Sequence, residues 1–192
     1  MAFERSDIRC GVICLQGDFA CHKRALERLG VPCREVRRAE QLEGLTHVIL
    51  PGGESTTLYR LGKDYGLLEP FVEKVRKGLA VFGTCAGAIL LGSGPEPPPR
   101  LCLVPVTVIR NAYGRQRESF TTPLRVSFLR EPVKGIFIRA PRITEVPAGA
   151  GVEILAYHNG DPVLIRFNRL LLCTFHPELT DNVEIHKYFL SL

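Results

Sequence analysis

The decapeptide VFGTCAGAIL, residues 81–90, joins an apolar run typical of a β-strand to an apolar run of helical composition, with a cysteine at the junction. Glycines flank Cys85 two positions away on either side, and in G-x-nucleophile-x-G turns such glycines let strand and helix approach without side-chain clash. Partial positive charge at the start of a helix favours thiolate over thiol. A buried structural cysteine is the common alternative. The flanking pattern favours an activated sulfur nucleophile.

Strands and helices alternate along the first half of the chain. Apolar runs of strand length occur at residues 9–15, 31–36, 47–50 and 79–82. Segments of helical period lie between or after them, at residues 19–29, 39–42, 55–61, 67–77 and 86–91. This alternation predicts a parallel sheet with right-handed crossovers. We therefore expect an α/β fold in which residues 1–192 form a single domain, with an open, mixed, mostly parallel sheet flanked by helices, as in flavodoxin-like proteins.

The second half of the chain is richer in predicted β structure. We expect short strands at residues 101–109, 124–128, 135–138, 152–157, 163–167 and 170–175. An exposed Gly- and Pro-rich loop is expected at residues 92–99, and a closing amphipathic helix at residues 181–192. These strands are too few for a core of their own, so no domain boundary is predicted.

Composition limits the possible functions. A net charge of +5 is spread along the chain without a basic tract, which argues against nucleic-acid binding. No run approaches the roughly 20 apolar residues of a membrane span, and residues 1–9 do not resemble a signal peptide, so we expect a cytoplasmic protein with no membrane partner. The seven cysteines form no C-x-x-C pair. We interpret them, apart from Cys85, as reduced core residues, and we expect no metal site.

The second stretch with chemical character is PGGESTT, residues 51–57, which follows the strand predicted at residues 47–50. Two glycines at the carboxyl end of a parallel strand let the backbone approach a ligand closely, and Ser55 or Thr56 can cap the next helix. A plain Gly-Gly turn is the alternative. Beside Cys85, this loop becomes a source for a second oxyanion-hole amide, at Gly53. Because neither Gly52 nor Gly53 has a Cβ, their peptide can also flip.

A histidine and a carboxylate follow the last predicted strand, where the chain reads HPE at residues 176–178. The strand end places His176 at the sheet edge that also carries Cys85, with Glu178 two residues on. A thiol nucleophile needs a base, and the base needs a carboxylate that fixes its tautomer. Cys85, His176 and Glu178 can fill these roles. The histidines at positions 22, 47, 158 and 186 have no comparable partner in the sequence.

Six motifs occur in order over residues 10–190: LQGDF, PGGESTT, GTCAGAILL, RNAYGRQ, FIRAP and FHPELT. Together they resemble the glutaminase subunits of two-component pyridoxal 5'-phosphate synthases, a family of triad (class I) glutamine amidotransferases. G-x-C-x-G with a distant HPE is shared by the superfamily, while PGGEST and NAYGRQ are specific to this family.

The resemblance implies hydrolysis of L-glutamine to glutamate and ammonia by Cys85, His176 and Glu178, with the Gly53 and Ala86 amides as oxyanion hole and no cofactor. It also implies that the ammonia passes to a synthase subunit, expected as a dodecameric ring with one glutaminase per synthase subunit. By resemblance, glutamine is bound by Gly52, Gly53, Glu54, Arg110, Ile138 and Arg139. Gln16 corresponds to a residue at the synthase interface. If docking there sets the productive orientation of the Gly52-Gly53 peptide, the isolated chain should hydrolyse glutamine poorly.

Three alternatives stay open at this point. The first is a glutaminase that serves another synthase, such as imidazole glycerol phosphate synthase. The second is an α/β hydrolase of another kind, such as a cysteine peptidase or a stress-response protein. The third is a binding module without catalysis, for which an intact triad would be unexpected.

Overall fold

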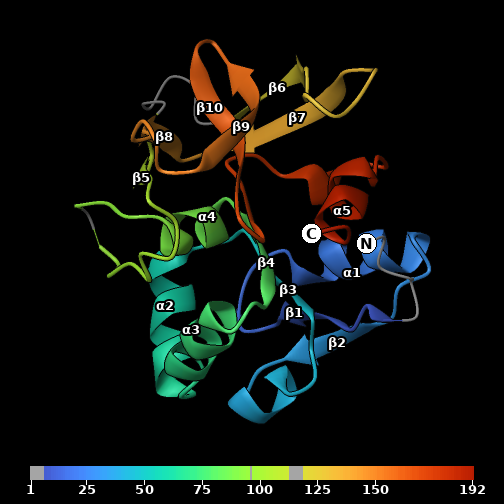
Figure 1. Cartoon of the computed structure of the whole chain (residues 1–192), viewed down its shortest axis with the longest axis vertical. Helices are drawn as coiled ribbons and strands as arrows, with labels where there is room; N and C mark the ends of the chain where they lie inside the picture. The colour runs from blue at the N-terminus through green and yellow to red at the C-terminus, as the bar shows by residue number, and fades with distance from the viewer. Residues whose placement is uncertain (1–6, 96, 113–118) are drawn as a thin grey trace.

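The computed structural model describes residues 7–95, 97–112 and 119–192. At its centre lies a seven-stranded sheet in the order β2-β1-β3-β4-β11-β10-β9 (Figure 1). The strands are β1 (Cys10–Ile13), β2 (Cys33–Val36), β3 (His47–Leu50), β4 (Ala80–Thr84), β9 (Val152–His158), β10 (Asp161–Phe167) and β11 (Leu170–Cys173). The first four and β11 pair in parallel, whereas β10 is antiparallel to both of its neighbours. The predicted mixed, mostly parallel sheet is confirmed.

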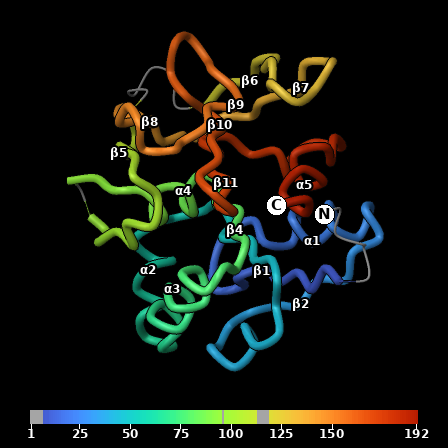
Figure 2. The backbone as a smooth tube through the Cα atoms, viewed as in Figure 1, coloured from blue at the N-terminus to red at the C-terminus, as the bar shows by residue number. Residues whose placement is uncertain are grey.

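Helices cover both faces of this sheet (Figure 2). Helices α1 (Phe19–Arg28) and α5 (Glu184–Phe189) pack on one face, and α2 (Ser55–Asp64), α3 (Leu68–Arg76) and α4 (Ala86–Leu91) pack on the other. Two 3-10 helices, η2 (Ala39–Leu42) and η4 (Pro177–Leu179), complete the helical elements of the described chain. In the α1–α5 layer each helix carries a buried histidine, His22 in α1 and His186 in α5.

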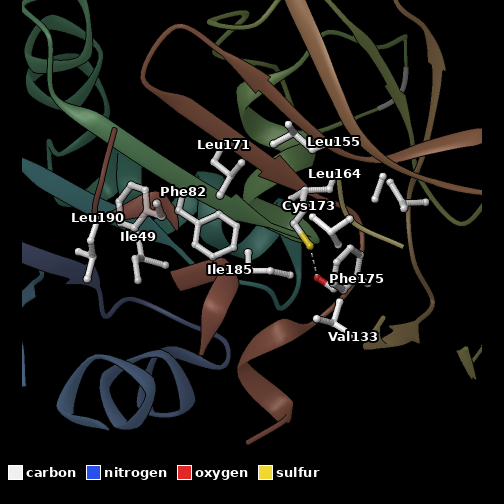
Figure 3. Close-up of a cluster of buried hydrophobic side chains, with 14 of the residues drawn as sticks. Ile49, Phe82, Val133, Leu155, Leu164, Leu171, Cys173, Phe175, Ile185 and Leu190 are labelled. Carbon is white, nitrogen blue, oxygen red and sulfur yellow. Dashed lines mark hydrogen bonds between the residues drawn. The ribbon is translucent and has the colours of Figure 1, made fainter. Parts of the chain in front are cut away.

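The sheet separates two hydrophobic cores, because successive side chains of a strand point to opposite faces. In β4, Phe82 packs with Ile185 and Leu190 of the C-terminal segment, whereas Val81 faces the α2–α4 side. Figure 3 shows the first of these cores, in which the Cys173 thiol donates a hydrogen bond to the Phe175 carbonyl oxygen at 3.1 Å. Strands buried on both faces explain the continuous apolar runs in the sequence.

Two small antiparallel sheets account for the β-rich second half: β5 (Thr107–Ile109) pairs with β8 (Arg142–Glu145), and β6 (Ser119–Leu124) pairs with β7 (Val133–Ile138). Several predicted bounds were wrong here. Residues 101–106 form no strand, residues 125–128 follow a strand instead of forming one, and β8 was not predicted. The closing helix is also shorter than expected, since α5 spans only Glu184–Phe189.

All seven cysteines are free. Cys10, Cys14 and Cys173 are buried as expected, and Cys85 is buried too. Cys21 and Cys33 are half-buried and Cys102 is exposed, so the interpretation as core residues was wrong for these three. Within the described residues, no helix combines the length and apolarity that crossing a membrane requires.

Candidate active site

Four parallel strands bring the candidate residues to one edge of the sheet. Gln16 follows β1, Gly52 follows β3, Cys85 follows β4 and His176 follows β11. Because these strands are parallel neighbours, their carboxyl ends meet at the same edge, where open α/β sheets bind their ligands. Residues separated by up to 160 positions in the sequence thus become neighbours.

Cys85 lies at a sharp turn between β4 and α4 with φ of 44° and ψ of −98°, a sparsely populated conformation for a residue with a side chain. The predicted reason for the flanking glycines is confirmed. A Cβ on Gly83 would lie 2.9 Å from the carbonyl carbon of Gly87, and one on Gly87 would lie 2.0 Å from the Leu50 oxygen. The two glycines let α4 press against β3 and β4, which holds Cys85 at the helix N-terminus.

His176 and Glu178 form a buried hydrogen-bonded pair. His176 Nδ1 lies 2.7 Å from Glu178 Oε1, with both residues under 7% exposed. Burial opposes a positive charge on the imidazole, but hydrogen bonds to Cys85 and to Glu178 outweigh it and raise the pKa of His176 to about 10. Burial raises the pKa of the Glu178 carboxyl, and the hydrogen bond from His176 opposes that rise. Since Nδ1 faces Glu178, Nε2 is left for the sulfur.

The turn after β1 holds the Gly52-Gly53 loop. The Gln16 side-chain oxygen accepts a hydrogen bond from the Glu54 amide at 2.9 Å, and the Asp18 amide donates to the Gly52 carbonyl at 3.2 Å. Gly53 has φ of 140°, and a Cβ there would lie 2.5 Å from Gln16 Oε1. The candidate oxyanion loop and the predicted interface residue Gln16 are therefore in direct contact.

The start of α2 differs from the sequence prediction. The cap is Glu54, whose carboxylate accepts hydrogen bonds from the Thr56 and Thr57 amides at 3.2 and 2.6 Å, and neither Ser55 nor Thr56 provides it. Arg110, at the end of β5, donates to the same carboxylate at 3.0 Å and to the Thr56 hydroxyl at 3.2 Å. Two residues that the resemblance assigned to glutamine binding thus also hold each other and the helix start.

A cavity of about 420 Å³ opens at this edge of the sheet. It is lined by Gln16, Asp18, Gly53, Glu54, Ser55, Cys85, Ile89, Arg110, Asn111, Ile138, Arg139 and His176. Ile138 and Arg139 lie at the end of β7. This strand contacts the base directly, because the His176 amide donates a hydrogen bond to the Ile136 carbonyl oxygen at 2.8 Å. Gly52 and Ala86 are not among the residues that line the cavity. Gly52 lies against His176, and Ala86 is the first residue of α4. The second part of the RNAYGRQ motif, residues 113–116, falls outside the described residues.

Sequence reasoning missed Asp18 and His22. Asp18 lines the cavity with its Oδ2 3.7 Å from His176 Nδ1, and His22 reaches Glu178 from α1 with Nε2 3.6 Å from Oε1. The sequence shows no comparable partner near His22, and in the fold its titratable partners come from more than 150 positions away. The signal in the sequence was a histidine on the apolar face of a predicted helix.

The oxygens of Asp18 and Glu178 and the Nδ1 of His176 lie within 4.8 Å of one another, so this group is where a metal ion could bind.

A cysteine on a strained strand-to-helix turn, beside a buried histidine–carboxylate pair at the ligand-binding edge of a doubly covered sheet, is the arrangement of α/β enzymes that use a cysteine nucleophile. The chain belongs to the SNO glutamine amidotransferase family, whose model matches residues 12–192. It is 48% identical over 188 residues to pyridoxal 5'-phosphate synthase subunit PdxT of Thermotoga neapolitana, covering 96% of this chain and 99% of the relative. Its identity to PdxT of Thermus thermophilus is 50% over 186 residues, covering 95% and 96%.

Solved structures agree with this assignment. A structure described as "crystal structure of glutamine amidotransferase" superposes with a TM-score of 0.89 at 48% identity, covering 94% of this chain and 96% of that chain. The structure of PurLQS from Thermotoga maritima matches with a TM-score of 0.67 at 15% identity, covering 91% and 90%. The second likeness is one of fold alone.

Proposed function

We propose that this chain hydrolyses L-glutamine to L-glutamate and ammonia as the glutaminase subunit of a pyridoxal 5'-phosphate synthase. The observation that carries the proposal is the cavity of about 420 Å³ that Cys85 and His176 line together with Gly53 and Arg139. Its volume suits a ligand the size of an amino acid. The names of the full-length relatives support this synthase over one for imidazole glycerol phosphate.

The reaction begins at the Cys85 sulfur. With a pKa of about 10, His176 already holds the thiol proton on Nε2 at neutral pH, and the Cys85 thiolate attacks the side-chain amide carbon of glutamine. The amides of Ala86 and Gly53 hold the resulting oxyanion, and each such donor contributes roughly 2.7–4 kcal/mol to the transition state. Ala86 is suited to this role because the first amides of a helix have no acceptor within the helix.

His176 then returns the proton to the departing nitrogen, so ammonia leaves and a glutamyl thioester forms. In the second half-reaction His176 removes a proton from water, the hydroxide attacks the thioester, and glutamate leaves as the Cys85 thiolate is restored. Glu178, at 2.7 Å from Nδ1, keeps the imidazole oriented with Nε2 toward the reaction throughout. No metal or organic cofactor takes part in these steps.

The cavity wall supplies the groups that hold the rest of glutamine. Arg139 is exposed at the end of β7 and offers its guanidinium to the substrate carboxylate. Glu54 presents a carboxylate for the substrate ammonium, and Arg110 fixes the orientation of Glu54. Ile138, 39% exposed, covers the aliphatic part of the substrate.

The ammonia is consumed by a synthase subunit that docks over the cavity, with Gln16 at the interface. We propose that the synthase forms a ring of twelve subunits and that each binds one copy of this chain. Native mass spectrometry of the mixed subunits measures this ratio, and a substoichiometric complex at saturation contradicts it.

The proposal is tested by treating the protein, with its synthase subunit present, with a diazoketone analogue of glutamine. Mass spectrometry then locates the adduct, while a parallel assay measures glutamate released from glutamine. We expect one adduct, on Cys85, and glutamate release that Cys85→Ala abolishes.

Cys102 provides an internal control because it is exposed and lies outside the cavity. An adduct on Cys102 in place of Cys85 would indicate general thiol reactivity and would contradict recognition of glutamine. A complex that forms without any glutamate release would support a binding module instead.

A further inference from the structure

A chain of buried polar side chains runs behind the candidate triad. His22 of α1 and His186 of α5 are fully buried, and His22 Nδ1 lies 3.0 Å from His186 Nε2. On its other side, His22 Nε2 lies 3.1 Å from Thr84 Oγ1. Thr84 is the residue before Cys85, so the two helices reach the nucleophile turn through these imidazoles.

The same His22 nitrogen faces the triad carboxylate. Glu178 Oε1 is 2.7 Å from His176 Nδ1 and 3.6 Å from His22 Nε2, and the side chains of Glu178 and His22 are fully inaccessible. Glu178 Oε2 is buried and has no hydrogen-bond partner within residues 7–95, 97–112 and 119–192. A buried carboxylate with so few donors depends strongly on each N–H that faces it.

The geometry favours one tautomer of His22. Its Nε2 faces the Glu178 carboxylate oxygen, so an N–H at this position is attractive and a lone pair would be repulsive, whereas the Thr84 hydroxyl fits either tautomer because it can accept or donate. With the proton on Nε2, Nδ1 must accept a hydrogen bond, which His186 Nε2–H supplies at 3.0 Å. Burial, with His186 and His176 nearby, also lowers the pKa of His22 well below its ordinary value, so the ring is neutral and carries one N–H.

We propose that His22 is a positioning residue for the reaction: its Nε2–H, 3.6 Å from the Glu178 oxygen that His176 also contacts, attracts that oxygen electrostatically and helps to keep the carboxylate in place, and His186 keeps His22 in the required tautomer. The inference rests on the proposed function, since it assigns His22 a role in the same triad. His22 is absent from the cavity wall, so it acts through Glu178 and His176 and does not contact glutamine.

Loss of the His22 N–H leaves the Glu178 carboxylate with the imidazole of His176 and the backbone amide of Glu178 itself. This carboxylate then has less to keep it in place, and a displaced carboxylate no longer orients the imidazole of His176. A tilt of His176 by about 1 Å can cost up to a hundredfold in rate. Titratable groups next to the His176–Glu178 pair are Asp18, Cys85, Cys173 and His22, and His186 faces His22.

The test compares His22→Leu, which removes the N–H, with His22→Gln, whose side-chain amide can donate from a similar position. Glutamine hydrolysis is measured in the complex with the synthase subunit. For His22→Leu we expect kcat to fall about tenfold or more with KM within about twofold of wild type, and a displaced pH profile for kcat. His22→Gln should recover most of kcat and the wild-type profile.

His47→Leu is the matched control. His47 is also fully buried and also contacts α5, through Phe189 at 5.2 Å between ring centroids, but it lies at the start of β3, away from the cavity. Its replacement should leave kcat and the pH profile unchanged.

A folded His22→Leu protein with wild-type kcat and pH profile would overturn the positioning role. So would failure of His22→Gln to improve on His22→Leu at equal stability. If both His22 variants fail to fold, His186→Leu replaces them, with a smaller fall in kcat expected and an unchanged kcat contradicting the role. A wild-type complex that releases no ammonia contradicts the proposed function instead, which separates the two failures.

Discussion

Gly52 lies against the imidazole of His176, at a distance that leaves no room for a side chain. A Cβ at this position would be 2.6 Å from His176 Cε1 and 3.4 Å from Cys85 Cβ. Since His176 is buried and held by Glu178, it cannot move aside without losing its orientation. The role of Gly52 therefore includes making space for the base.

For Gly52→Ala we expect glutamine turnover to fall at least about tenfold because the imidazole is displaced from the sulfur. Steady-state kinetics in the complex measures this. Gly30→Ala is the control: Gly30 has φ of 71° with open space around it, so the change should cost about 1 kcal/mol of unfolding free energy and leave turnover unaltered. Wild-type turnover in Gly52→Ala would contradict the steric argument.

Some residues of the candidate site could be predicted from the sequence and others could not. Cys85 is predictable because a local glycine pattern encodes its turn, and His176 because a strand end precedes it. His22 is not, because its helical spacing matches an ordinary core residue. Its partners Glu178 and His186 belong to segments more than 150 residues away, and only tertiary packing brings them within reach.

At the scale of elements, the N-terminus of α2 carries a prediction of its own. The Glu54 carboxylate caps the helix, whereas the Ser55 hydroxyl is buried and without a partner in the described part of the chain. Glu54→Ala should therefore lower the unfolding free energy by about 1 kcal/mol, while Ser55→Ala should be close to neutral. Urea unfolding measures both, and equal losses would contradict the assignment of the cap.

The elements of the second half were harder to predict because their partners are not local. Residues 101–106 are as apolar as a strand, yet their amides donate to carbonyls at the end of α4: Leu101 to Leu90 at 2.8 Å and Leu103 to Leu91 at 2.9 Å. These amides therefore pair with the free carbonyl groups at the end of α4 and not with a neighbouring strand. β6 contains Pro123, which a strand tolerates at an edge, and β6 pairs only with β7 among the described strands.

At the scale of the whole molecule, the turn at residues 16–18 couples the expected synthase interface to the oxyanion loop. Reversing the Gly52-Gly53 peptide would break the Asp18–Gly52 hydrogen bond of 3.2 Å, and Gln16 holds the next amide. We therefore expect the isolated chain to hydrolyse glutamine slowly and the synthase subunit to accelerate it. Equal turnover with and without the synthase would remove this idea.

Three neutral histidines are buried, so the free energy of unfolding depends on pH in the acid range. Burial lowers the pKa of His47 and of His186 to about 4, and burial with neighbouring histidines lowers the pKa of His22 well below its ordinary value. In the unfolded chain these groups titrate near 6.5. Between about pH 6.5 and pH 4 the unfolded chain therefore binds more protons than the folded one, so stability falls as the pH falls.

The expected slope is about 1.4 kcal/mol of unfolding free energy per pH unit for each such proton. Glu178 partly offsets it, because its raised pKa lets the folded state take up a proton above pH 4.5. His176 matters at alkaline pH: with a pKa of about 10, it stabilises the fold fully below pH 6.5, and this contribution is lost as the pH rises toward 10.

Urea unfolding at pH 7, 6 and 5 should show the acid slope of the unfolding free energy. His47→Leu should reduce this slope by close to one proton because that site no longer titrates. A stability that stays constant from pH 7 to pH 5 would mean that these imidazoles accept protons in the folded state, and the neutral His22 on which the tautomer argument depends would then be wrong as well.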